Sequence, residues 1–182
     1  DEFAKELEKE NTTPLGWKVF SSDSILKINI KKSEFIVEHL IPAGCITILS
    51  GQPGTGKSWL LLEIARCVGS GNPLFMGNSV SVESFNRFPV KEVRVLYVDE
   101  ESAAEEIKRR WEILKPGICT LVDFATMNSL KIDNENDRKN LLDFAILKGT
   151  KLIIFDSLRD MHLLDENNSK DAQSLIDYFR GF

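Results

Sequence analysis

The segment Gly51-Gln52-Pro53-Gly54-Thr55-Gly56-Lys57-Ser58 determines how the rest of this 182-residue sequence is interpreted. It matches the pattern GxxxxGK[ST] at every fixed position. The preceding run, Cys45 to Leu49, is apolar and β-branched and predicts a short strand, whereas Lys57 to Gly69 carries apolar residues at helical spacing. A glycine-rich turn that binds nothing has no reason to place Lys57 and Ser58 at this spacing. The sequence therefore predicts a phosphate-binding loop between a strand and a helix.

Each residue type in this loop has a chemical role. Glycines let the backbone wrap around a polyphosphate, so that successive N–H groups form an anion-binding nest, and the following helix directs its positive end at the same anion. Lys57 is expected to reach the β- and γ-phosphates, and the Ser58 hydroxyl is expected to join the shell of a Mg²⁺ ion. We therefore expect ATP and Mg²⁺ as ligands. The expected nucleotide-binding residues are Gly51, Gln52, Pro53, Gly54, Thr55, Gly56, Lys57, Ser58 and Trp59.

A second acidic position is needed to hold Mg²⁺ through water. The run from Lys151 to Asp156 is almost continuously apolar, as is typical of a strand buried on both faces, and it ends in the carboxylate of Asp156. The alternative for Asp156 is a simple cap at the end of a strand. Ser157 follows it, so ATPases that place their water-activating carboxylate directly after this aspartate do not fit.

Three carboxylates, Asp99, Glu100 and Glu101, follow another predicted strand and offer the missing base. A carboxylate near the γ-phosphate can orient and polarise the attacking water. If the extended conformation continued beyond Asp99, alternation would place Glu101 on the same face as Tyr97. The alternative is a solvated acidic loop before a helix, for which Ser102 has the spacing of a capping residue.

Strand and helix patterns alternate along the second half of the chain. Strands are predicted at 94–99, 120–124 and 151–156. Helices are predicted at 57–69, 103–114, 134–148 and 169–179, with Ile146 on the apolar side of the third helix. Residues 70–92 have the composition of a long loop. This alternation predicts an α/β fold, a mainly parallel sheet flanked by helices, over residues 34–182. Residues 1–33 have too few apolar residues for a core of their own and are interpreted as an N-terminal arm.

The composition is that of an ordinary folded protein, which argues against disorder and against a disulfide scaffold. The formal net charge of −5 argues against a surface covered in basic residues for nucleic acid. The run Lys108-Arg109-Arg110 is better explained as a solvated helix face paired with glutamates than as a contact to a phosphate backbone. Neither a secretory signal nor an apolar segment of membrane-spanning length occurs, and Cys45, Cys67 and Cys119 have the apolar settings of reduced core thiols. A cytoplasmic protein without membrane association is expected.

Three segments together resemble the RecA-type core ATPases: GQPGTGKS at 51–58, VLYVDEES at 95–102 and LIIFDSLRDMHLLDENNS at 152–169. Within this class the chain most resembles the group that contains the RepA-type hexameric plasmid helicases and related AAA-type ATPase domains. The resemblance implies that Lys57 and Ser58 contact phosphate and Mg²⁺, that Asp156 supports Mg²⁺, and that Glu101 is the catalytic base. It also implies a RecA-like fold and an ATPase activity.

The resemblance leads to expectations about the whole protein. In this family, further strands and DNA-facing loops come after the region that corresponds to Arg180-Gly181-Phe182, so the core is expected to be truncated at its C-terminus. A homo-oligomeric ring or filament is expected, because family members usually receive an arginine from a neighbouring subunit. Coupling of ATP hydrolysis to DNA replication, unwinding or remodelling on single-stranded DNA is the first functional hypothesis. A KaiC-like regulatory module, in which ATP controls partner binding without unwinding, and small-molecule phosphotransfer remain as alternatives.

Overall fold

The computed structural model describes residues 19–28, 34–74, 88–117, 119–163 and 169–180. Contacts divide the chain into two units, Asp1–Ser33 and Glu34–Phe182. The described part of the first unit contains one short helix, α2 (Ser22–Ile25), which begins after Ser21. The Ser21 hydroxyl oxygen accepts a hydrogen bond of 3.1 Å from the backbone N–H of Ser24, as an N-cap residue does. Most of the predicted N-terminal arm lies outside the described residues.

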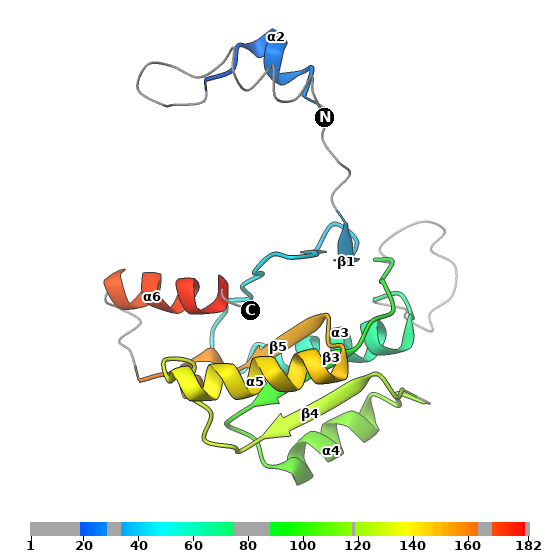
Figure 1. Cartoon of the computed structure of the whole chain (residues 1–182). Coiled ribbons are helices and arrows are strands. Elements are labelled where there is room, and N and C mark those ends of the chain that lie inside the picture. The colour runs from blue at the N-terminus through cyan, green and yellow to red at the C-terminus, as the bar shows by residue number, and fades with distance from the viewer. Residues whose placement is uncertain (1–18, 29–33, 75–87, 118, 164–168, 181–182) are drawn as a thin grey trace. The chain divides into compact units, whose positions relative to one another are not determined.

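The second unit contains a parallel three-stranded sheet (Figure 1) made of β3 (Val95–Asp99), β4 (Val122–Thr126) and β5 (Leu152–Asp156). The strand order is β4-β3-β5, and all three strands run in the same direction. Asp99 at the end of β3 pairs with Thr126 on one side and with Asp156 on the other. The carboxyl ends of the strands are therefore level, and residues from all three meet at one edge of the sheet.

Helices cover both faces of this sheet. On one face, α3 (Lys57–Ser70) and α4 (Ala104–Ile113) pack in a core that includes Tyr97 and Ile154. On the other face, α5 (Glu135–Lys148), the short 3₁₀-helix η1 (Leu158–Met161) and α6 (Ser169–Arg180) contribute to a core around Leu96 and Val98. The chain thus has the predicted α/β fold, in which a parallel sheet is flanked by helices, and its arrangement is that of a RecA-like P-loop domain.

A small antiparallel pair precedes the glycine-rich loop. It consists of β1 (Phe35–Val37) and β2 (Ile41–Pro42), joined by a turn in which His39 has a φ of 59°. Val37 also forms an isolated antiparallel bridge with Val90, so the pair is tied to the segment that leads into β3. This contact links the start of the second unit to the middle of the same unit.

The predicted strand from Cys45 to Leu49 is not formed. No described strand pairs with residues 45–50, and this segment is exposed along its length, with Ile48 at 69%. Within the described part of the chain β5 pairs with β3 alone, so its outer edge has no partner strand, and residues 45–50 do not pair with it. The β-branched composition of 45–49 indicates a local preference for extended backbone, and that preference does not by itself produce strand pairing.

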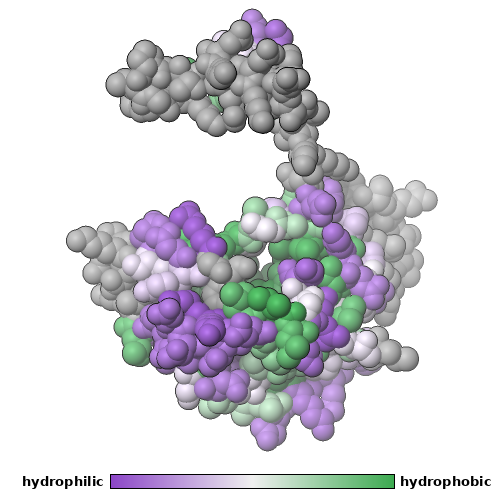
Figure 2. Space-filling model, in the orientation of Figure 1, coloured by the Kyte–Doolittle hydropathy of each residue, from purple (hydrophilic) through white to green (hydrophobic). Residues whose placement is uncertain are grey.

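The surface of α5 divides along its length. Figure 2 shows hydrophilic surface over its N-terminal half and hydrophobic surface over its C-terminal half. Leu141 and Ala145 are buried, whereas Ile146 and Leu147 are exposed, so the expectation that Ile146 lies on the apolar side against the sheet is wrong. Across the described ranges, none of the helices combines the length and the apolar character needed to span a bilayer.

Candidate nucleotide-binding site

The glycine-rich loop has the backbone conformation that its glycines permit. Gly54 has a φ of 78° and Gly56 a φ of 85°, both in the left-handed region that residues with a side chain rarely adopt. A Cβ placed on either residue would meet no heavy atom within 4 Å, so the space beside both residues is open. Gly56 is also the N-cap residue of α3, and the first residue of this helix is Lys57, as predicted.

The Lys57 side chain is folded back over this loop. Its Nζ donates to the carbonyl oxygen of Gly51 at 2.8 Å and to that of Gln52 at 2.9 Å. The Thr55 hydroxyl donates to the same Gln52 oxygen at 2.8 Å. The ammonium group therefore lies against the loop, where an anion in the cradle would be within its reach.

The residues at the start of α3 fit a phosphate ligand with Mg²⁺. This 14-residue helix has no side-chain hydrogen bond at its N-cap and no acidic residue in its first turn, which leaves its first N–H groups available to an anion. Ser58 and Asp156 supply a hydroxyl and a carboxylate, the hard oxygen ligands that Mg²⁺ prefers. Trp59 follows at the same helix end and is about one-third exposed, at 36%.

Asp156 is a buried carboxylate at the end of β5, with 7% of its surface exposed. The Tyr97 hydroxyl donates to its Oδ2 at 2.6 Å. Burial, reinforced by the neighbouring Asp156 charge, raises the pKa of Tyr97 well above its ordinary value, so the phenol remains a donor at neutral pH. Sequence reasoning identified Asp156 but treated Tyr97 only as a strand residue.

The three carboxylates after β3 have different surroundings. Asp99 is buried, and its Oδ1 accepts the backbone N–H groups of Glu101 (2.9 Å) and Ser102 (2.7 Å). This turn ends the extended conformation at Asp99, so the strand alternation does not continue to Glu101. It also moves the helix start, because α4 has Ala103 at its N-cap and Ser102 does not cap it as predicted.

Glu100 holds a neighbouring loop, whereas Glu101 is exposed. The Glu100 carboxylate accepts the backbone N–H groups of Asn128 and Leu130, both at 3.2 Å. The Glu101 side chain has neither a hydrogen bond nor an ion pair with any residue that the structure describes. Of the three carboxylates, Glu101 is thus the one whose oxygens are open to water and ligand.

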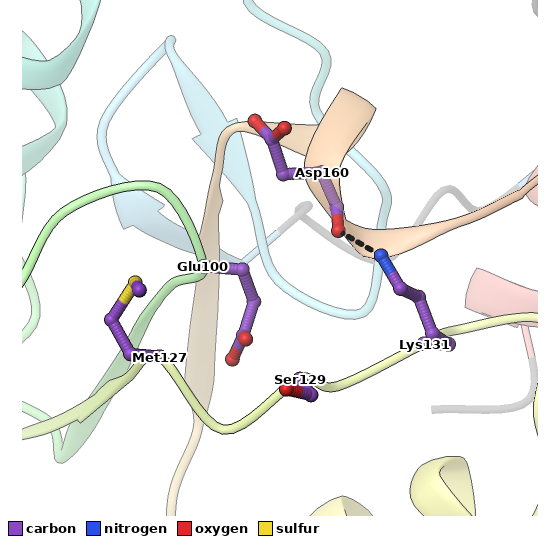
Figure 3. Close-up of a pocket in the computed structure, with 5 residues that line it drawn as sticks. All are labelled: Glu100, Met127, Ser129, Lys131 and Asp160. Atoms are coloured by element: carbon purple, nitrogen blue, oxygen red, sulfur yellow. Dashed lines mark hydrogen bonds between the residues drawn. The ribbon is translucent and has the colours of Figure 1, made fainter.

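A pocket of about 250 Å³ lies beside these residues (Figure 3) and is lined by Glu100, Met127, Ser129, Lys131 and Asp160. Lys131 Nζ donates to the backbone oxygen of Asp160 at 2.6 Å, and Met127 and Ser129 have φ values of 52° and 58°. Sequence reasoning did not identify this pocket, because its lining comes from three separate segments that only the sheet brings together. The three acidic residues after β3 were the one available signal.

The basic run on α4 is neutralised by its own helix. Glu106 accepts hydrogen bonds from Arg109 and Arg110, and Lys108 lies 3.8 Å from Glu112. These two arginines lower the pKa of Glu106 to about 2. The interpretation of this run as a paired, solvated helix face is confirmed for Glu106.

The cysteines are free thiols in different settings. Cys67 is buried, Cys119 is half-buried and Cys45 is exposed. The prediction of a core thiol is confirmed for Cys67 and is wrong for Cys45, which lies in the segment that forms no strand.

The sequence was compared with known proteins and protein families. A search of curated proteins finds no match to the chain. Residues 17–182, well over half of the sequence, match the family described as the AAA domain. The chain belongs to this AAA-domain family of P-loop ATPases.

Proposed function

We propose that the chain binds ATP with Mg²⁺ at Gly51–Ser58 and hydrolyses it with Glu101 as the base. The observation that carries this proposal is the different use of the three carboxylates after β3. Asp99 is buried and closes a turn through its Oδ1, and both oxygens of Glu100 hold the loop at 128–130. Glu101 is exposed, and it is the carboxylate that is free to accept a proton from water.

The other residues act on phosphate and charge. Lys57 would exchange its two carbonyl partners for phosphate oxygens, which gain more from a cation than neutral carbonyls do. Ser58 and Asp156 would hold Mg²⁺, which neutralises charge on the phosphates when it is bound. Glu101 would orient the attacking water and take its proton.

Replacement of single side chains tests these roles. Glu101→Gln keeps the shape and removes the base, so we expect nucleotide binding to be retained and turnover to fall at least about 100-fold. Glu105→Gln is the matched control, because Glu105 is an exposed carboxylate in the first turn of α4. Hydrolysis is measured by phosphate release and binding by fluorescence anisotropy. Unchanged hydrolysis in E101Q would contradict the assignment.

We further propose that hydrolysis is coupled to movement on, or remodelling of, single-stranded DNA by a homo-oligomer. The arginines support the need for a neighbouring subunit. In the described part of the chain every arginine except Arg159 has a hydrogen-bond or ion-pair partner within its own chain. Light scattering with ATP that detects only monomer would count against a ring or filament.

An ATP-gated regulatory module is the second candidate, and the pairing on α4 favours it. Glu106 and Glu112 occupy the cations of Lys108-Arg109-Arg110, so this run offers little free charge to a phosphate backbone. ATPase assays with and without single-stranded DNA, next to a strand-displacement assay, separate the two candidates. Stimulation by DNA supports the motor, and indifference to DNA supports the switch.

A further inference from the structure

We propose that Tyr97 is a positioning residue that fixes the Asp156 carboxylate for Mg²⁺. This inference rests on the proposed function, because it assigns Tyr97 a role in the Mg²⁺-dependent part of nucleotide binding. Tyr97 does not contact nucleotide in this role. It acts through one hydrogen bond, from its hydroxyl to Asp156 Oδ2 at 2.6 Å.

The sheet register explains why this contact forms. Tyr97 pairs with Ile154 across β3 and β5, and Asp156 lies two residues further along β5 on the same face. A long side chain can reach this diagonal neighbour across adjacent strands. The Tyr97 ring is fully buried and lies 5.8 Å from the Phe124 ring, centroid to centroid, so packing on β4 holds it in place from the other side.

The hydrogen bond from Tyr97 makes the two oxygens of the Asp156 carboxylate different from each other. A buried carboxylate is costly unless hydrogen bonds compensate it, and Tyr97 supplies one such bond to Oδ2. Among the described residues, none donates a hydrogen bond to Oδ1, which is therefore the oxygen left for the Mg²⁺ shell. Loss of the hydroxyl would let the carboxylate turn and would weaken the Mg²⁺-dependent share of nucleotide affinity.

Tyr97→Phe tests this directly, because it removes one oxygen and keeps the ring. The affinity for a fluorescent ADP analogue is measured by anisotropy with Mg²⁺ and with EDTA. We expect the ratio of the two affinities to fall about 10-fold in Y97F, the size of one hydrogen bond to a charged group, while the affinity in EDTA stays unchanged. Tyr178→Phe is the matched control: Tyr178 packs against Arg138 on the other face of the sheet, and Y178F should behave as wild type.

A double variant separates positioning from general stability. Asp156→Asn should also lower the Mg²⁺ enhancement, and the Y97F/D156N pair should lose no more than D156N alone, because Tyr97 acts through Asp156. Additive losses, or a Mg²⁺ enhancement in Y97F equal to that of wild type, would overturn the inference and leave the proposed function intact. If the nucleotide affinity of the wild-type protein were the same with and without Mg²⁺, both the inference about Tyr97 and the proposed function would be overturned.

A second readout does not require the Tyr97 variant to fold. Since the chain has 2 tyrosines, Y178F retains Tyr97 as its single tyrosine, which can be labelled with ¹³C at Cζ. Addition of Mg²⁺ to the nucleotide-bound protein should move this NMR signal, because the charge on the carboxylate that accepts its hydrogen bond is partly neutralised. An unmoved signal would contradict a link between Tyr97 and the ion.

Discussion

The three cysteines differ in how strongly the packing around them limits the reactivity of the thiol. Burial raises the pKa of Cys67 to about 12, whereas Cys45 is exposed. Because the thiolate is the reactive form, iodoacetamide at about pH 8 should alkylate Cys45 first, then half-buried Cys119 and last Cys67. Peptide mass spectrometry over time measures the three rates, and unfolding in guanidinium should make them similar. Modification of Cys67 as fast as Cys45 in the native protein would show that the core around α3 opens readily.

The contacts of Glu106 lead to a prediction of how the stability of the protein changes in acid. Hydrogen bonds from Arg109 and Arg110 lower its pKa from 4.5 to about 2. A carboxylate with a lowered folded pKa stabilises the protein above its unfolded pKa, and that contribution is lost as the pH falls from about 4.5 to 2. Glu106→Gln should therefore lower the melting temperature slightly at pH 6, and this deficit should shrink steadily as the pH falls from about 4.5 towards 2, with exposed Glu105→Gln as the control. A deficit as large at pH 2 as at pH 6 would argue against the ionic origin.

At the residue scale, local patterns were enough to propose candidate site residues, whereas contacts between distant residues could not be predicted. Lys57 and Ser58 were proposed as phosphate and Mg²⁺ ligands because the motif of the loop consists of adjacent residues. The Tyr97 contact to Asp156 was missed because it joins positions 59 residues apart, which only the strand register brings together. Glu101 was proposed as the base from the resemblance, and the sequence could not show that Glu100, unlike Glu101, has its carboxylate held by a loop after β4.

At the scale of elements, helices with clear ends were predicted closely. The fourteen-residue helices α3 and α5 begin and end within one residue of prediction, because a glycine loop starts the first and Gly149, with a φ of 71°, ends the second. The run at 45–49 was predicted wrongly, since a strand forms only where its backbone pairs with a neighbour, and composition alone does not determine that pairing. The β1–β2 pair was not predicted because its strands are only three and two residues long.

The packing of α3 on β4 depends on one glycine. A Cβ at Gly69 would collide with the Val122 side chain and lie 3.1 Å from Cys119 Sγ. Gly69→Ala should therefore destabilise the protein by about 1–3 kcal/mol, despite the better helix propensity of alanine. Urea unfolding followed by circular dichroism measures this loss. Val122→Ala in the same chain should recover part of it, and a strictly additive double variant would show that the collision is relieved in another way.

At the scale of the whole molecule, alternation of strand and helix was enough to predict the architecture. Parallel strands need crossover connections, and the helices between β3, β4 and β5 supply them on both faces of the sheet. The pocket at the carboxyl ends of the strands could not be predicted in the same way. Its shape depends on the positive φ values of Met127 and Ser129, a conformation that no pattern of apolar residues encodes.

The division into Asp1–Ser33 and Glu34–Phe182 leads to a prediction for the chain as a whole. The sheet, the glycine-rich loop and the contact from Tyr97 to Asp156 all lie in the second unit. Removal of residues 1–33 should therefore leave a cooperatively unfolding protein whose Mg²⁺-dependent nucleotide affinity stays within about threefold of the full chain, since no described residue of the first unit belongs to the site. Thermal unfolding and the ADP-analogue titration measure both properties. Loss of binding with folding intact would mean that the first unit contributes residues to the nucleotide site.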